Sequence, residues 1–384
     1  MSMISFEMSE ITEQIRTAAR KFTQEEIAPG VIDRDVNSIF PSDILHTLGE
    51  LGFMGMMVQP EYGGSGLDTV SYIAAIEEFS KVEASVGTIL SVHNSLVNWI
   101  VEYFGNDFQK EKYLTRLASG EFLGAFSLSE PEAGSDATRQ HTIAVKDGKN
   151  WLLTGTKNWV TSGSTADIYI VFAQTNKELG HKGISCFLIE KDTPGFSSSK
   201  KEDKMGLRSS DTCSLGLLNA VVPEDNLIGG VGGGFRIAME SLNGGRIGIA
   251  AQAVGIAQAA YEASLKYSQE RHSFGKPICE HQLIQQKLAR MATNIEAARL
   301  LTYKAAWLKD THQNYIQASA MAKLFATTIA NDITREAIQI HGGYGYVREY
   351  QVERFFRDAK VTEIYEGTSE IQHIVIAREL LKNC

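Results

Sequence analysis

The stretch Val361-Thr-Glu-Ile-Tyr-Glu-Gly-Thr-Ser-Glu-Ile-Gln372 lies close to the end of the chain. Within it, Ser369 is followed three residues later by Gln372, a capping-box pattern that predicts the start of a last helix. Glu366 then lies on a tight turn just before that helix. A carboxylate at this place is either a surface acid that the helix dipole favours or a functional group. Motifs elsewhere in the chain are needed to distinguish a surface acid from a functional group.

The 384-residue chain has the composition of a globular protein, with 43% hydrophobic and 22% charged residues. A chain of this length is expected to form two or three domains of roughly 100 to 200 residues each. Its net charge of -9 argues against nucleic acid or an anionic membrane as the main partner, because both need a basic face. The net charge does not exclude a local basic pocket that binds an anionic substrate.

Targeting and metal-binding signals are weak. No apolar run approaches the roughly 20 residues of a membrane span. The opening MSMISFEMSEITEQIR lacks the apolar region of a signal peptide and is acidic early, unlike a transit peptide. The cysteines are far apart and form no Cys-x-x-Cys pair, so neither a metal site nor a disulfide framework is indicated; they are Cys186, Cys213, Cys279 and Cys384. The separated cysteines fit a reducing compartment best, and we therefore expect a cytoplasmic protein.

The hydrophobic pattern changes twice along the chain. Residues 1–122 show helical periodicity broken at prolines and glycines, which predicts an N-terminal α-helical domain. Residues 123–230 contain short β-rich runs with no helical segment between them, which predicts a middle antiparallel β domain. Residues 231–384 predict a C-terminal four-helix bundle. Its helical stretches are 235–270, 281–309, 313–341 and 369–382. The predicted fold class is α+β multidomain.

The run Gly229-Gly-Val-Gly-Gly-Gly234 superficially resembles a dinucleotide-binding fingerprint. That fingerprint requires a parallel βαβ unit of its own, and the preceding region predicts antiparallel strands. We therefore interpret the run as a hinge that leads into a helix.

Two motifs in the middle region carry groups that suit a ligand. Leu128-Ser-Glu-Pro-Glu-Ala-Gly-Ser-Asp136 places hydroxyls and backbone N–H groups on a turn. Such groups bind a polar heterocycle or a phosphate, or simply form the turn. Trp159-Val-Thr-Ser-Gly163 ends a strand with an indole, which is either a core residue or a stacking surface for a flat cofactor.

Two motifs in the last region interrupt long helices. Arg271-His-Ser-Phe-Gly-Lys-Pro-Ile278 is a basic turn, which either suits a pyrophosphate or forms a solvated corner. Gln339-Ile-His-Gly-Gly-Tyr-Gly-Tyr346 has several glycines where a helix ends, although a plain helix stop needs only one. The additional glycines indicate close approach of the backbone to a ligand.

Together and in this order, closed by Ile364-Tyr-Glu-Gly-Thr368, these motifs resemble the acyl-CoA dehydrogenase family of flavoenzymes. The resemblance covers essentially the whole chain, includes the α-β-α order, and is strongest to the butyryl, or short-chain, branch. It implies FAD held without a Rossmann fold and a homotetramer built as a dimer of dimers. It also implies acyl-CoA as substrate and electron transfer flavoprotein as the acceptor of electrons.

The resemblance implies roles for individual residues. Those facing the flavin ring are Phe126, Leu128, Ser129, Gly134, Ser135, Trp159, Val160 and Thr161, with Thr368 and Glu370 from the last helix. Those holding the pyrophosphate and ADP end, partly on a neighbouring subunit, are Arg271, Phe274, Gln282, Gln339, Gly342 and Gly343. Those meeting the substrate are Ser135, Asn243, Arg246, Tyr365 and Gly367. Two positions depart from the family pattern, which often has Asp at Asn243 and a small residue at Arg139.

The implied reaction removes two hydrogens from an acyl-CoA to give the trans-2-enoyl-CoA. Glu366 would take the α-proton while the β-hydride passes to flavin N5. A flavin ribityl hydroxyl and the backbone N–H of Glu366 would bind the thioester oxygen, and burial would raise the pKa of the base. Some family members carry this glutamate at the position of Gly245, which leaves Glu366 as the one candidate here.

We expect acyl-CoA substrates with a straight acyl chain of about four carbons, and short branched acyl chains are the alternative. An acyl-CoA oxidase would share the chemistry, but its typical chain is longer and has an extra C-terminal domain. A non-catalytic relative that binds a ligand, such as DNA, would not need Glu366, and the charge of -9 also opposes it.

Overall fold

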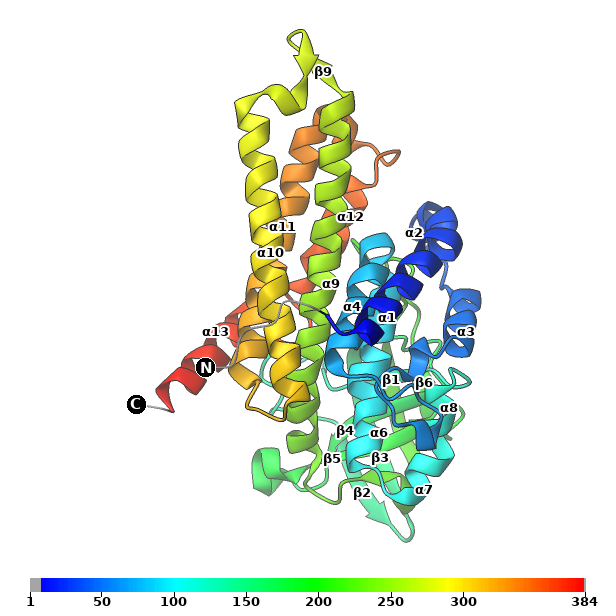
Figure 1. Ribbon diagram of the computed structural model, residues 1–384. Coiled ribbons are helices and arrows are strands. Elements are labelled where there is room, and N and C mark those ends of the chain that lie inside the picture. The colour runs from blue at the N-terminus through cyan, green and yellow to red at the C-terminus, as the bar shows by residue number, and fades with distance from the viewer. Residues whose placement is uncertain (1–7, 383–384) are drawn as a thin grey trace.

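The computed structural model describes residues 8–382, so Cys384 lies outside the described residues. In chain order these residues form a helical part, a β-sheet and a second helical part, which confirms the predicted fold class (Figure 1).

Short helices make up the N-terminal part. The α-helices are α1 (Glu10–Phe22), α2 (Val31–Asn37), α3 (Ser42–Glu50), α4 (Thr69–Val82), α5 (Ala84–Ser91), α6 (Trp99–Phe104), α7 (Asp107–Gln109) and α8 (Thr115–Ala118). Between them lie the π- and 3-10-helical turns η1 (Thr23–Ile27), η2 (Ala28–Gly30), η3 (Phe53–Gly55), η4 (Pro60–Tyr62), η5 (Val92–Asn98) and η6 (Lys110–Leu114).

One sheet forms the middle part. Its strands are β1 (Gly124–Ser127), β2 (Ile143–Asp147), β3 (Asn150–Thr161), β4 (Ile168–Gln174), β5 (Ile184–Glu190), β6 (Phe196–Ser198), β7 (Thr212–Pro223) and β8 (Leu227–Ile228), with turns η7 (Lys177–Gly183) and η8 (Glu224–Asn226). The strand order is β6-β7-β3-β2-β4-β5-β8, with β1 beside β4. Pairing is antiparallel as predicted, except that β1 runs parallel to β4 and β2 meets β4 in a single parallel pair.

Long helices dominate the C-terminal part. The elements are α9 (Gly234–Glu270), β9 (His272–Ser273), β10 (Lys276–Pro277), η9 (Ile278–Glu280), α10 (Gln282–Asp310), α11 (Ile316–His341), η10 (Gly342–Tyr346), α12 (Val352–Thr362) and α13 (Ser369–Leu381). Figure 1 shows α9, α10 and α11 side by side, extending past the rest of the molecule to a tip at β9. Helix α12 was not predicted, and it packs against α9 and α11. The run of glycines before α9 is a turn after β8, without a βαβ unit.

The last helix begins at Ser369 as predicted, but the predicted capping box of Ser369 and Gln372 is wrong. The N-cap is Thr368, whose hydroxyl accepts a hydrogen bond from the backbone N–H of Ile371 at 3.4 Å. Ser369 lies inside the helix, and its hydroxyl has no hydrogen-bond partner among the described residues. Thr368 serves as the cap because its backbone is still extended, with ψ at 165°, as N-cap residues require.

Helix α4 joins the N-terminal helices to the long helices. The Asp310 carboxylate, at the end of α10, accepts hydrogen bonds from the backbone N–H groups of Thr69 (2.8 Å) and Val70 (3.0 Å). An acid at a helix N-terminus satisfies donors that have no partner within the helix. The buried carboxylate of Glu77 on α4 pairs with Arg299 of α10 at 2.7 Å, so this charge is not buried alone.

A buried histidine joins the N-terminal helices to the sheet. The backbone N–H of Gly124 in β1 donates to Nδ1 of His93 at 3.1 Å, and Nε2 lies 2.9 Å from the carbonyl oxygen of Leu117. Since Nδ1 accepts, the proton is on Nε2, which donates to Leu117. Burial lowers the pKa of His93 to about 4, so the ring is neutral at physiological pH.

Within residues 8–382, no helix is long and apolar enough to cross a membrane. The same residues hold no cluster of His, Cys, Asp and Glu side chains suited to a metal ion. Cys186, Cys213 and Cys279 are free thiols.

Helix α9 approaches its neighbours closely at glycines. A Cβ atom at Gly255 would lie 2.4 Å from the backbone oxygen of Glu77 in α4. A Cβ atom at Gly244 on the same helix would meet only the end of the Lys309 side chain, at 3.6 Å. The first position is therefore closed to any side chain, and the second is open.

We predict that Gly255→Ala destabilises the protein by about 1–3 kcal/mol, because backbone atoms of α4 cannot move aside easily. The matched control Gly244→Ala should be neutral or stabilising by up to about 1 kcal/mol, since alanine favours the helix. Thermal unfolding midpoints of the two variants and the wild type provide the measurement. Equal midpoints for the two variants would contradict the proposed close packing of α9 on α4.

Candidate active site

The carboxylate of Glu366 is buried without a partner. Glu366 lies on the turn between α12 and α13, in the left-handed region with φ at 51°. Neither carboxylate oxygen has a hydrogen-bond partner among the described residues. Burial raises the pKa of Glu366 to about 7, while the positive charges of Lys323 and Arg246 act in the opposite direction. A carboxylate of this kind can accept a proton near neutral pH.

Helix α9 forms the wall against which this carboxylate packs. A Cβ atom at Gly245 would lie 2.0 Å from Oε2 of Glu366, so only glycine leaves room for the carboxylate. One residue further on, the buried guanidinium of Arg246 donates from Nη1 to Oδ1 of Asn243 at 2.7 Å. Burial lowers the pKa of Arg246 to about 10. The structure thus brings Asn243 and Arg246 to the same place as Glu366.

The two residues beside Glu366 are fixed by the interior. The hydroxyl of Tyr365 donates to Oε1 of Gln252 on α9, which directs its ring inward. The carbonyl oxygen of Gly367 accepts hydrogen bonds from Nζ of Lys323 at 2.7 Å and from Nε2 of Gln372 at 2.8 Å. Sequence reasoning missed Lys323 and missed this role of Gln372.

A buried ion pair fixes the loop after β1. Nζ of Lys157 lies 2.7 Å from the Glu130 carboxylate and also donates to the backbone oxygen of Leu128 at 3.2 Å. Both side chains are almost fully buried. Ser129 is held as well, because its backbone oxygen accepts a hydrogen bond from the N–H of Asn158. The sequence did not draw attention to Lys157, although it lies four residues after the buried Leu153 in β3 and therefore on the same inward face.

Beyond this anchor the loop opens to solvent. Gly134 and Ser135 are exposed, and a Cβ atom at Gly134 would have nothing within 4 Å. Arg139, whose exposure the sequence could not show, is also exposed. On β1, Phe126 is half-buried against the ring of Phe172. The polar groups of this loop are therefore available to a ligand.

Trp159 is not a core residue. Its side chain is 66% exposed, and its φ of 60° is rare for a residue other than glycine. An irregularity in the pairing of β3 with β7 falls between Lys157 and Val160, which turns the indole outward while Val160 stays buried. Thr161 follows at the end of the strand, half-buried. An exposed indole held in this way offers a flat stacking surface.

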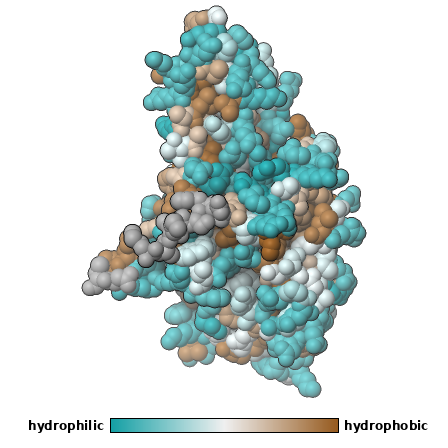
Figure 2. Space-filling view, viewed as in Figure 1, coloured by the Kyte–Doolittle hydropathy of each residue, from teal (hydrophilic) through white to brown (hydrophobic). Residues whose placement is uncertain are grey.

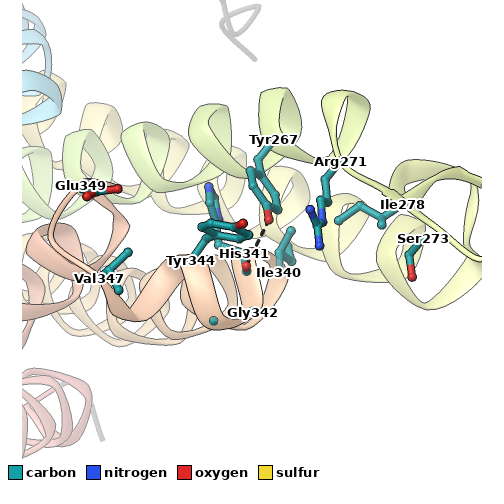
Figure 3. A pocket seen from close by; sticks show the side chains of 11 residues that line it. Tyr267, Arg271, Ser273, Ile278, Ile340, His341, Gly342, Tyr344, Val347 and Glu349 are labelled. Atoms are coloured by element: carbon teal, nitrogen blue, oxygen red, sulfur yellow. Dashed lines mark hydrogen bonds between the residues drawn. The ribbon is translucent and has the colours of Figure 1, made fainter.

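A pocket of about 590 Å³ lies near the tip of the long helices. Its lining residues are Tyr267, Arg271, Ser273, Ile278, Ile340, His341, Gly342, Gly343, Tyr344, Val347 and Glu349. Figure 3 shows the ring of Tyr267 close to His341, with Arg271 beside it. The two rings stack with centroids 4.2 Å apart, and the Arg271 guanidinium lies 5.5 Å from the centre of the Tyr344 ring.

Other predicted residues lie at the surface. Phe274 is 95% exposed on the turn between β9 and β10, and Gln282 and Gln339 are exposed near the tip without lining the pocket. Glu370 is exposed in the first turn of α13.

The predicted site residues do not all lie together. Arg246 lies near Glu366, whereas Arg271 lies at the tip of the same helical segment, about 37 Å away by helical rise. Figure 1 shows the same separation, with β9 at one end of the molecule and β3 and β4 towards the other.

Three family models match successive parts of the chain. Residues 9–121 match the acyl-CoA dehydrogenase N-terminal domain, residues 125–220 the middle domain, and residues 232–381 the C-terminal domain.

Two curated relatives extend over almost the whole chain. An acyl-CoA dehydrogenase of Bacillus subtilis is 51% identical, with 96% of this chain and 97% of that protein covered. A short-chain specific acyl-CoA dehydrogenase of Megasphaera elsdenii is 46% identical, with 99% and 100% covered.

Two solved structures have nearly the same fold. Butyryl-CoA dehydrogenase from Megasphaera elsdenii has a TM-score of 0.97 at 46% identity, with 98% of this chain and 100% of that chain covered. A chain from a structure described as an electron transferring flavoprotein of Acidaminococcus fermentans has a TM-score of 0.98 at 47% identity, with 99% and 100% covered. From the three matched domains and these full-length similarities, the chain belongs to the acyl-CoA dehydrogenase family, whose members are oxidoreductases that act on a CH–CH bond.

Proposed function

We propose that this protein is a FAD-dependent short-chain acyl-CoA dehydrogenase in which Glu366 takes the α-proton. The buried, unpartnered carboxylate of Glu366 against the bare backbone of Gly245 carries this proposal. Family members place the base either at this turn or on the helix at the position of Gly245, and here the two positions meet in space. The proposed domain boundaries stay at 1–122, 123–230 and 231–384.

The residues present fit FAD. The exposed indole of Trp159 suits a flat ring, and the open loop at Gly134 and Ser135 suits polar groups at its edge. Ring contacts are proposed for Phe126, Leu128, Ser129, Gly134, Ser135, Trp159, Val160, Thr161, Thr368 and Glu370. The pyrophosphate and ADP end is proposed to meet Arg271, Phe274, Gln282, Gln339, Gly342 and Gly343, because a guanidinium binds phosphate oxygens well. When bound, FAD supplies the acceptor for the β-hydride.

The separation of Trp159 from Arg271 supports an oligomer. Figure 1 shows β3, which carries Trp159, far from the tip that carries Arg271, so we propose that a neighbouring subunit supplies the tip. This agrees with a homotetramer built as a dimer of dimers. Large hydrophobic side chains are exposed on α10 and α13, and Figure 2 shows hydrophobic patches among the hydrophilic surface of the long helices. These residues are Leu283, Leu300, Trp307, Ile374, Leu380 and Leu381. Such surface is available for contacts between subunits.

The chain's own residues then perform four tasks. Asn243 and Arg246 bind the substrate beside Glu366, and the backbone N–H of Glu366 donates to the thioester oxygen. That donor stabilises the negative charge that develops as the α-proton leaves. The Glu366 carboxylate receives this proton and holds it. Burial keeps water away and raises the pKa of the acceptor to about 7, which makes it a stronger base than an exposed glutamate.

Short straight acyl chains of about four carbons are the proposed substrate, and short branched chains are the alternative. Similarity to the butyryl-CoA and short-chain specific relatives supports this choice. Electron transfer flavoprotein is the proposed electron acceptor, because a chain with nearly the same fold comes from a structure described as an electron transferring flavoprotein. A cytoplasmic location is proposed as well.

Glu366→Gln tests the proposal directly, because it keeps the shape of the side chain and removes the proton acceptor. We expect normal FAD content, acyl-CoA binding within a few fold, and flavin reduction slower by at least ~10²-fold. Anaerobic stopped-flow reduction by butyryl-CoA measures this. A rate within tenfold of the wild type would refute Glu366 as the base.

Arg271→Ala should lower the FAD content and weaken the tetramer together, because Arg271 is proposed to reach the FAD of a neighbouring subunit. Flavin absorbance per protein and analytical ultracentrifugation measure the two effects. Lys149→Ala, at an exposed position of the turn between β2 and β3, is the control and should change neither. Full FAD content with loss of turnover alone would disprove the contact across subunits.

The chain-length profile should peak near four carbons. Each methylene that fits in an apolar pocket contributes about 0.8 kcal/mol, and chains beyond the pocket gain nothing further. Values of kcat/KM for straight acyl-CoAs, with isobutyryl-CoA and 2-methylbutyryl-CoA beside them, give the profile. A steady rise out to palmitoyl-CoA would exclude both the straight and the branched short-chain choices.

A further inference from the structure

Lys323 ties the turn of Glu366 to a different helix. Its side chain is fully buried on α11, and Nζ donates to the carbonyl oxygen of Gly367 at 2.7 Å. A lysine is rarely buried unless its ammonium group has partners. The partner here is the backbone directly after Glu366, so the position of the turn relative to α11 depends on this contact.

Gln372 holds the same turn from the start of α13. Its Nε2 donates to the carbonyl oxygen of Gly367 at 2.8 Å and to that of Glu366 at 3.4 Å. Both turn residues have a left-handed backbone, with φ at 51° for Glu366 and 92° for Gly367. For Gly367 this costs little, but for Glu366 such a conformation persists only when its surroundings fix it. Lys323 and Gln372 share this task, but only Lys323 carries a charge.

The charged groups around the turn influence one another's pKa values. Glu366 faces the cations of Lys323 on α11 and Arg246 on α9, and the neutral hydroxyl groups of Tyr72 on α4 and Tyr365 are also near. The charged groups that act on Lys323 are Glu366, Arg246, Glu363 and Glu370. Burial lowers the pKa of Lys323 to about 8, and Glu366 is the largest influence in the opposite direction. The ammonium group is therefore mostly charged at neutral pH.

Arg246 and Lys323 have different partners. The guanidinium of Arg246 is bound to Asn243 and belongs to the proposed substrate contacts. Lys323 contacts the turn itself. We propose that Lys323 is a positioning residue for the proton acceptor, whose ammonium group holds the carbonyl of Gly367 and keeps the Glu366 carboxylate charged before substrate binds. This inference rests on the proposed role of Glu366 as the base.

The sign of the expected effect follows from the charges. Burial raises the pKa of Glu366, and Lys323 opposes that rise. Removal of the ammonium group should therefore raise the pKa of Glu366 further. A protonated carboxyl cannot accept the α-proton, so the loss of rate should be greatest at low pH.

Three variants separate the charge from the hydrogen bond. Lys323→Met removes both and keeps similar volume, Gln372→Met removes a neutral donor to the same carbonyl, and Lys323→Arg keeps the charge. Lys323→Gln is a second neutral variant in case the methionine variant does not fold. The FAD-loaded protein without substrate is titrated by infrared spectroscopy, and Glu366→Gln identifies the carboxyl band of Glu366. Anaerobic reduction by butyryl-CoA is then followed across the same pH range.

In Lys323→Met, the Glu366 band should titrate about one pH unit higher than in the wild type. At pH 6 its flavin reduction should be about tenfold slower than that of Gln372→Met, with a smaller difference at high pH. Gln372→Met should slow reduction at every pH without moving the midpoint. Lys323→Arg should restore the midpoint.

An unchanged Glu366 midpoint in the neutral Lys323 variants would overturn the electrostatic part of the proposal. Wild-type reduction rates at high pH in those variants would overturn the positioning part. Failure of the proposed function gives a different result: Glu366→Gln would reduce at a normal rate while the infrared band still shifted without Lys323.

Discussion

A Cβ atom at Gly245 would lie 2.0 Å from a carboxylate oxygen of Glu366, so α9 reaches the turn before α13 only because residue 245 is glycine. This contact sets the geometry around it. The same helix packs on α4 at Gly255 and carries Arg246 to the carboxylate. A side chain at Gly245 would push the turn away and expose the carboxylate to water. Its pKa would then fall towards that of an ordinary glutamate.

Close packing alone would leave an uncompensated negative charge, which is costly in a dry interior. The structure places two cations near this charge without a direct salt bridge to it among the described residues. A direct salt bridge would hold the carboxylate in its charged form and make it a poor base. Nearby cations without contact keep the charge tolerable while the carboxylate stays free to receive a proton. The balance between burial and these cations gives a pKa of about 7.

The domain order was predictable because hydrophobic periods of helices and strands differ over many residues. The features that the sequence predicted wrongly, or did not predict, depend on single contacts. Thr368 and Ser369 are both good N-caps, and the pattern of Ser369 and Gln372 pointed to the wrong one because Gln372 instead binds the turn carbonyls. Nothing local shows that β1 pairs in parallel with β4, since the partner lies far along the chain. From the sequence alone, a lysine within a long helix, such as Lys323, is expected to be exposed to solvent. Only the fold shows that its ammonium group lies beside Gly367.

The length of α9 links the proposed chemistry to the proposed assembly. One end of this helix holds the residues around Glu366, and the other carries Arg271 to the pocket near the tip. Under the proposed function, one FAD meets the ring contacts of one subunit and the phosphate contacts of its neighbour. Such a ligand binds the assembled form more tightly than the separated subunits. By linkage it must also stabilise the assembly, so loss of cofactor and loss of quaternary structure become one coupled equilibrium.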